Sequence, residues 1–173
     1  MEHIVVITAV GRDRPGMIAA LTRAVLDAGG TLDDATMTRL HGAFATMLAA
    51  RLPSPAAAHG LRDALKPKGE ELGLTITVQD APETHAEAPP DIGLTVYGAD
   101  RPGIVHAVTR LLGDQGVNIT DMDTRVAGTA DAPIYVMLLE ASSQGKDLAG
   151  ALDTLRRTLG VDITQHPLDT EAL

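Results

Sequence analysis

Gly11-Arg12-Asp13-Arg14-Pro15-Gly16, in the first half of the chain, returns in the second half as Gly98-Ala99-Asp100-Arg101-Pro102-Gly103. Residue 13 corresponds to residue 100, an offset of 87 residues. Further identical residues keep this offset without a gap: Thr8 and Thr95, Thr22-Arg23 and Thr109-Arg110, Asp27 and Asp114, Gly29 and Gly116, and Asp34 and Asp121. One chance tetrapeptide would not bring these partners with it, so the pattern indicates an internal duplication.

The boundary between the two copies follows from composition. Residues 80–91 replace the apolar pattern with prolines, acids and small side chains, which is typical of a linker. We therefore predict a first domain over 1–80, a linker over 81–90 and a second domain over 91–173. About 80 residues is small for a single core, so each copy is expected to gain buried area by packing or dimerisation.

Each copy has the same predicted order of elements. An alternating strand precedes the repeated motif, and a helix with one apolar face follows it. Next come a strand pair, which turns near His41-Gly42 in the first copy and over 127–131 in the second, then a helix and a short strand. The order β-α-β-β-α-β predicts an α+β fold of two tandem ferredoxin-like domains, each an antiparallel four-stranded sheet with helices on one face.

Composition excludes several classes of function. The formal net charge is −9 and no Lys/Arg cluster occurs, which disfavours direct binding to nucleic acid or to an anionic membrane. The absence of cysteine removes disulfides, thiolate catalysis and cysteine-ligated zinc. No apolar run approaches the ~20 residues of a membrane helix, and Met1–Ile4 lacks the features of a signal peptide. A cytoplasmic protein is the expectation.

No catalytic residue, metal site or cofactor is predicted. The six histidines lack the spacing of metal ligands, and neither a nucleophile elbow nor a phosphate-binding loop is present. The paired acids Asp33-Asp34 and Asp121/Asp123 would suit a cation, but solvated acids on a strand face explain them as well. Ser142-Ser143 is expected to cap the helix that follows it.

The repeated motif has a physical role at the start of a helix. We expect Asp13 and Asp100 to cap the helix N-termini, and the proline of each copy to stand in the first turn. The last glycine of each motif would let a ligand approach the backbone, where free amides attract a carboxylate or a phosphate. A well-formed helix start without a ligand remains the alternative.

The second copy resembles the ACT domain, a regulatory module of amino-acid metabolism. The resemblance rests on the stretch 98–105, the helix after it, Gly116-Val117-Asn118-Ile119 and Asp121, and it covers essentially the whole chain as two copies. The overall layout, with the stretch 65–72 before a strand, is similar to the glycine cleavage system transcriptional repressor family.

The resemblance implies that ACT domains pair side by side and bind an amino acid at their interface, with backbone amides from the first loop and a side chain from the start of the second strand. The candidate ligand-binding residues are Asp100, Gly103, Ile104, Asn118 and Ile119 in the second copy and Asp13, Gly16, Met17, Thr31 and Leu32 in the first. Because Thr31 stands where the second copy has Asn118, the stretch from Asp100 to Asn118 is expected to form the stronger half-site. Asn118 is also explained as a turn residue after Gly116.

Three functions follow as hypotheses. The first is a non-catalytic regulator that binds a small amino acid, glycine or serine, and acts as a homodimer on a protein partner such as a transcriptional regulator. The second is a detached regulatory subunit of an enzyme of amino-acid metabolism. The third is a dimerisation adaptor that binds no ligand.

Overall fold

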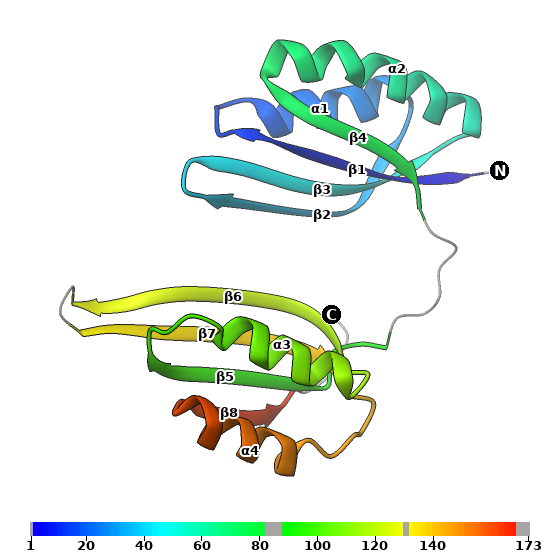
Figure 1. The fold of residues 1–173 in the computed structure, drawn as a ribbon. Helices are drawn as coiled ribbons and strands as arrows, with labels where there is room; N and C mark the ends of the chain where they lie inside the picture. The colour runs from blue at the N-terminus through cyan, green and yellow to red at the C-terminus, as the bar shows by residue number, and fades with distance from the viewer. Residues whose placement is uncertain (1, 82–87, 130–131, 169–173) are drawn as a thin grey trace. The chain divides into compact units, whose positions relative to one another are not determined.

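The computed structural model describes residues 2–81, 88–129 and 132–168. The chain divides into two compact units, Met1–His85 and Ala86–Leu173. Each unit has the order β-α-β-β-α-β (Figure 1). Most of the linker expected over 81–90 lies outside the described residues.

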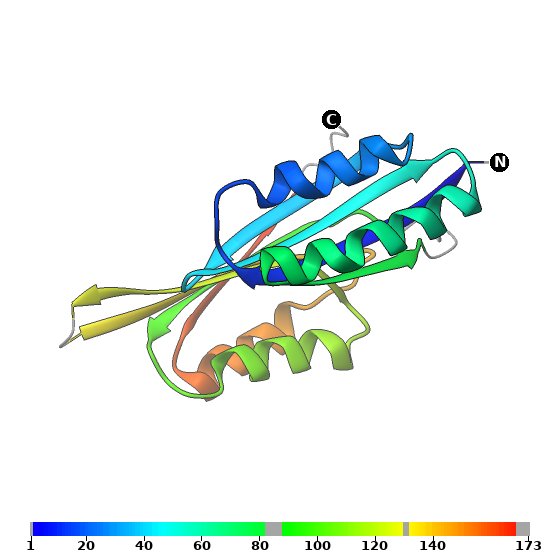
Figure 2. The same ribbon diagram turned by 90° about the horizontal axis from the view of Figure 1, so that it is seen from above.

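The first unit is a four-stranded antiparallel sheet in the order β2-β3-β1-β4. Its elements are β1 (His3–Arg12), α1 (Met17–Asp27), β2 (Thr31–Leu40), β3 (Ala43–Leu52), α2 (Pro55–Leu72) and β4 (Leu74–Asp80). Figure 2 shows α1 and α2 lying side by side over one face of the sheet. The expected turn at His41-Gly42 has φ values of 48° and 80°, the positive pair that a tight two-residue hairpin turn needs.

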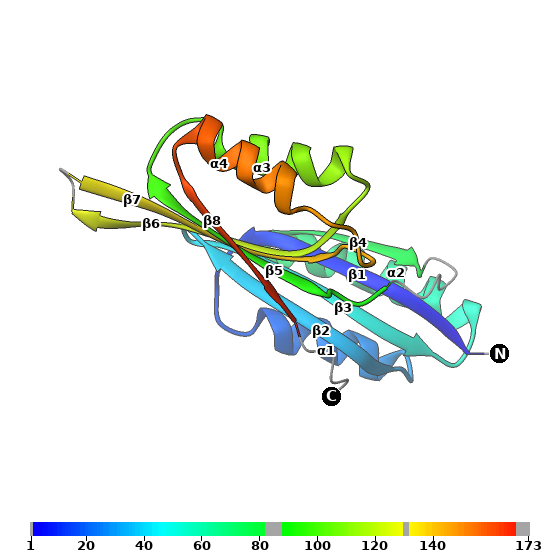
Figure 3. The same ribbon diagram turned by 90° about the horizontal axis from the view of Figure 1, so that it is seen from below.

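The second unit repeats this arrangement in the order β6-β7-β5-β8. Its elements are β5 (Ile92–Ala99), α3 (Ile104–Asp114), β6 (Asn118–Thr129), β7 (Ala132–Ser142), α4 (Ala149–Leu159) and β8 (Asp162–Pro167). Figure 3 shows α3 and α4 together on one face of this sheet. The β6–β7 hairpin is longer than expected, and its tip at 130–131 lies outside the described residues. The prediction of two tandem ferredoxin-like domains is confirmed.

Period-two alternation places the core of each unit between sheet and helices. On β1, Val5, Ile7 and Ala9 are fully buried, whereas Val10 on the other face is 46% exposed. The helix α1 contributes its own buried stripe of Met17, Leu21 and Val25. Full burial of such a side chain stabilises a fold by about 1.5–3 kcal/mol, so these aliphatic layers hold the loops at their ends in place.

The strands β2 and β6 are the edge strands next to the hairpin in each unit. All ten residues of β2 are exposed, and one side of its backbone has no partner strand among the described residues. Both edge strands are irregular at the same point, between Leu32 and Asp34 and between Ile119 and Asp121. A long, exposed edge of this kind is available for pairing with another strand.

No helix in the described parts of the chain is long and apolar enough to cross a membrane.

Candidate functional site

The loop between the first strand and the first helix of each unit ends in a glycine that caps the helix. Gly16 and Gly103 are the N-cap residues, with left-handed φ values of 91° and 95°, and neither helix has a side-chain cap. The expectation that Asp13 and Asp100 cap these helices, with proline in the first turn, was therefore wrong, because each helix begins after the glycine. A Cβ atom added to Gly103 would meet no atom within 4 Å, so the backbone conformation, rather than crowding, calls for glycine.

Each helix N-terminus presents free backbone amides. The first intrahelical bond to the cap runs from the Ala107 amide to the Gly103 carbonyl at 2.9 Å, and Ala20 and Gly16 form the same bond at 2.9 Å. The amides between cap and bond have no intrahelical acceptor, and the helix dipole adds partial positive charge there. This terminus is suited to a carboxylate. Ile104 would contribute only its amide, since its side chain is buried in the core.

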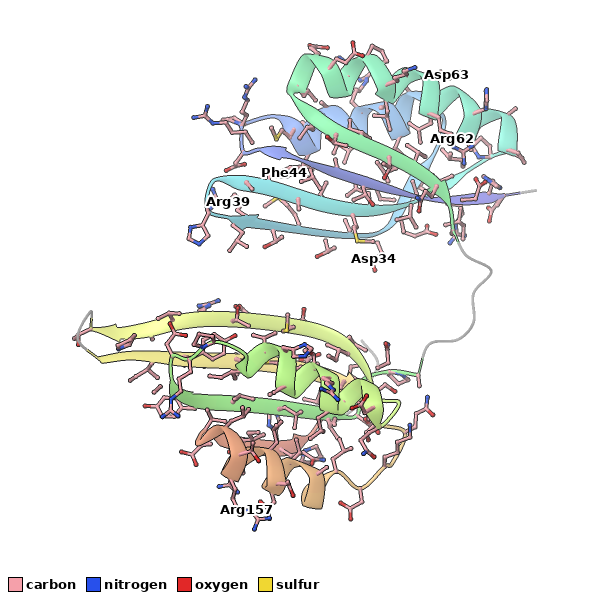
Figure 4. All side chains as sticks on the ribbon, in the orientation of Figure 1. Asp34, Arg39, Phe44, Arg62, Asp63 and Arg157 are labelled. Atoms are coloured by element: carbon pink, nitrogen blue, oxygen red, sulfur yellow. The ribbon has the colours of Figure 1, made fainter. Side chains whose placement is uncertain are left out.

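The two copies differ in how this loop is held. In the first unit, Arg39 of β2 forms an ion pair with Asp13 at 3.2 Å, near the end of the hairpin (Figure 4). In the second unit, strand register places Val126 where the first has Arg39. Asp100 is exposed and forms no side-chain hydrogen bond or ion pair with any residue that the structure describes. The second loop therefore lacks the ion pair that links the first loop to β2.

An aromatic residue lies beside the motif in both units. Phe44 is paired with Gly11, and Tyr135 with Gly98, so the two aromatics are equivalent in register. Phe44, labelled in Figure 4, is 2% exposed and belongs to the core. Tyr135 packs against the second core, and its hydroxyl oxygen exposes less than 1 Å² without a hydrogen-bond partner in the described residues.

The structure does not bring Asn118 to the loop of its own unit. Asn118 is exposed at the start of β6 and pairs with Ser142, whereas the end of β5 pairs Ala99 with Ile134. These pairs are eight residues apart along β7, or roughly 26 Å at the rise of a strand. One small amino acid cannot touch both ends, so Asp100 to Asn118 is not a continuous half-site within one domain.

The first unit has the same separation. Thr31 and Leu32 begin β2 and are exposed, and Thr31 pairs with Arg51, far along β3 from the pair formed by Arg12 and Ala43. The loop residues Asp13, Gly16 and Met17 therefore stand at the opposite end of the sheet from Thr31 and Leu32. In both units the sequence predicted two separate halves of a site rather than a complete one.

A lysine that sequence reasoning missed supports the start of β6. The Lys146 ammonium group donates to the carbonyls of Gln115 and Gly116, at 2.9 and 2.7 Å. These carbonyls follow the end of α3, and Asn118 begins β6 two residues after Gly116. A cation at a helix C-terminus is favoured by the dipole, so Lys146 helps to fix where the asparagine begins its strand.

An aspartate holds the loop that carries Lys146. Asp91 accepts hydrogen bonds from the Ser143 amide at 2.6 Å, the Ser143 hydroxyl at 2.8 Å and the Gly145 amide at 3.2 Å. The bond from the Ser143 amide, more than any other contact, lowers the pKa of Asp91. The expectation that Ser142-Ser143 caps the second helix was wrong, because Leu148 is the N-cap of α4 and Ser143 is bound by Asp91.

The acidic pairs and the histidines do not form a metal site within residues 2–81, 88–129 and 132–168. Asp33 accepts two bonds from Arg51, at 3.1 and 2.9 Å, and Asp123 pairs with Arg125 at 2.9 Å. A groove of ≈ 410 Å³ lies between α1 and α2, with alanines as half of its lining residues, and it does not include the motif loop. The loop end and the strand start therefore remain the candidate site.

Comparison with known proteins assigns both units to the same domain family. Models of the ACT domain match residues 3–79 and 93–160. The glycine cleavage system transcriptional repressor of Escherichia coli strain K12 is 27% identical over 152 residues, which are 86% of this chain and 80% of that protein. A UPF0237 protein of Methanopyrus kandleri is 33% identical over 75 residues, 43% of this chain and 83% of its own. A crystal structure of an unknown protein from Galdieria sulphuraria shares the fold, with a TM-score of 0.80, 24% identity and coverage of 97% and 99%.

Proposed function

The chain belongs to the ACT domain family through both of its units, and from this we propose that it is a non-catalytic regulatory protein that binds a small amino acid. The observation that carries the proposal is the N-terminus of α3, which has no side-chain cap. Its first amides have no acceptor within the helix, its cap is a glycine in the left-handed region, and Asp100 forms no ion pair among the described residues. An amino-acid carboxylate is the anion that such a terminus would hold.

The second half of the site would come from the edge strand of another ACT domain. The strand β6 runs in the direction of β5, because both are antiparallel to β7. If two copies of the chain paired antiparallel along β6, the start of one strand would meet the end of the other. Asn118 of one copy would then approach the Gly103 loop of the second. A homodimer of this kind would complete a site that a single domain leaves in two parts.

Glycine is the first ligand to test and serine the second. The name of the Escherichia coli relative refers to control of the glycine cleavage system. By analogy, this chain would respond to glycine and alter the activity of a protein partner such as a transcriptional regulator. With a formal net charge of −9, it is better suited to act through such a partner than to bind DNA itself. The ligand would shift partner binding only by its different affinity for two states of the chain.

Isothermal titration calorimetry with glycine, serine and the remaining amino acids tests the proposal. We expect one amino acid to bind saturably. Its affinity should be about tenfold or more lower in Asn118→Ala, because the hydrogen bond from the Asn118 carboxamide to the ligand is lost. Thr31→Ala, the equivalent truncation in the first unit, is the matched control and should bind as the wild type does. If no amino acid binds at millimolar concentration, the chain is instead an adaptor that binds no ligand.

A further inference from the structure

The Tyr135 hydroxyl oxygen is buried and has no hydrogen-bond partner among the residues that the structure describes. In the described residues only this oxygen and Ser142 Oγ are buried side-chain oxygen or nitrogen atoms without a partner. Leaving such a group unpaired costs stability, so its presence in the second unit calls for an explanation. Tyr135 is the one that pairs in register with Gly98, the first residue of the repeated motif.

Several contacts place Tyr135 on the helix side of the sheet, below the loop. Met137 and Leu139, which follow it at every second position of β7, are buried in the core together with Ile104, the first residue of α3. Tyr135 packs against the same core. The Asp100 amide reaches the Pro133 carbonyl, two residues before Tyr135, at 3.4 Å. The phenol therefore lies on the helix-covered side of the sheet, against the core that Ile104 of α3 enters.

The first unit lacks this hydroxyl. Phe44 occupies the equivalent register position, and there Asp13 of the loop forms an ion pair with Arg39. With Tyr135 in place of Phe44 and Val126 in place of Arg39, the second unit has a hydroxyl donor beside the motif and lacks the ion pair that the first loop forms. Both differences point to ligand binding in the second unit and against it in the first.

We propose that Tyr135 determines ligand binding in the second unit by donating a hydrogen bond from its hydroxyl to the carboxylate of an amino acid held at the α3 amides. The inference rests on the proposed function and adds to it a donor and the ligand group that this donor recognises. Because the oxygen is enclosed in the ligand-free chain, a ligand reaches it only by displacing some of the atoms that cover it. The bond is charge-assisted, which makes it among the stronger hydrogen bonds available to a tyrosine.

Tyr135→Phe is the direct test, since Phe44 shows that the fold accepts phenylalanine at this position. Calorimetry with glycine and serine should show affinity about tenfold or more below that of the wild type. The ligand-free variant should unfold at a higher temperature, because the unpaired hydroxyl is gone. Tyr97→Phe is the matched control, since Tyr97 is 47% exposed and its variant should keep wild-type affinity.

The amide of the same amino acid identifies the group that is recognised. The wild-type preference for glycine over glycinamide, or for serine over serinamide, should shrink in Tyr135→Phe. Unchanged affinity in Tyr135→Phe would overturn the inference and leave the proposed function standing, as would weaker binding with an unchanged preference. A wild-type chain that binds no amino acid would instead overturn the proposed function and, with it, the inference.

Discussion

The motif glycine and a helical glycine of the second unit should respond in opposite directions to one chemical change. Gly103 caps α3 with a φ of 95°, and Gly113 lies within the same helix. A Cβ atom at either position would meet nothing within 4 Å. Replacement by alanine therefore tests backbone conformation at both sites without a steric clash.

The two costs follow from the backbone. An L-residue in the left-handed region is disfavoured by about 1–2 kcal/mol, so Gly103→Ala should lower the free energy of unfolding by roughly this amount. Alanine is favoured over glycine within a helix by about 1 kcal/mol, so Gly113→Ala should raise it by up to this amount. For a unit of this size each kcal/mol moves the unfolding midpoint by about 4–8 °C.

Tyrosine fluorescence follows the unfolding of the second unit alone. The chain has two tyrosines, Tyr97 and Tyr135, both in the second unit, and it has no tryptophan. Thermal unfolding followed by this signal should show a lower midpoint for Gly103→Ala and an unchanged or higher one for Gly113→Ala. Equal midpoints for Gly103→Ala and the wild type would refute the explanation that the left-handed backbone requires glycine in the motif.

Three further predictions concern the contacts around the candidate site. Asp91→Asn should destabilise the second unit at neutral pH. Because the pKa of Asp91 is lowered in the folded state, the carboxylate stabilises the wild type above about pH 4, and this stability is lost as the pH falls further. In acid titrations followed by tyrosine fluorescence, the stability of the variant should therefore depend less on pH than that of the wild type. Gly11→Ala would place a Cβ atom 2.5 Å from the Gly73 carbonyl oxygen and should cost about 1–3 kcal/mol in chemical denaturation followed by circular dichroism; no change in midpoint would contradict the tight packing. Lys146→Met removes the bonds to the Gln115 and Gly116 carbonyls just after α3 and should cost about 1 kcal/mol or less. We also expect weaker amino-acid binding in calorimetry, and unchanged binding would mean that Lys146 does not position Asn118.

The fold was predictable from the sequence because local and global patterns agree. Alternating apolar residues in the strands, a single apolar face on each helix and the repeat itself all point to two β-α-β-β-α-β units. The turn at His41-Gly42 was found where the short hairpin needs two residues with positive φ. The length of the β6–β7 hairpin was underestimated, because the break in the apolar pattern at 127–131 does not mark where strand pairing stops.

The site was only partly predictable, since its geometry depends on register. The motif correctly marked a helix start, but the sequence does not show that Gly103 rather than Asp100 is the cap. Nor does it show that the loop and Asn118 lie at opposite ends of the sheet, which follows only from the pairing of β5 and β6 with β7. The Phe44 and Tyr135 equivalence was missed for the same reason: the longer hairpin moves β7 away from the constant offset of 87 residues that aligns the rest of the repeat.

The measurement that tests the central claim most directly is the thermal unfolding of the wild-type chain with and without an amino acid, followed by tyrosine fluorescence. A ligand at 100 times its dissociation constant stabilises the state that binds it by about 2.7 kcal/mol. If the second unit holds an amino acid, saturating glycine or serine should therefore raise its midpoint by about 10 °C or more. An unchanged unfolding midpoint with every amino acid, at concentrations of tens of millimolar, would contradict the account and leave the chain without a sensing role.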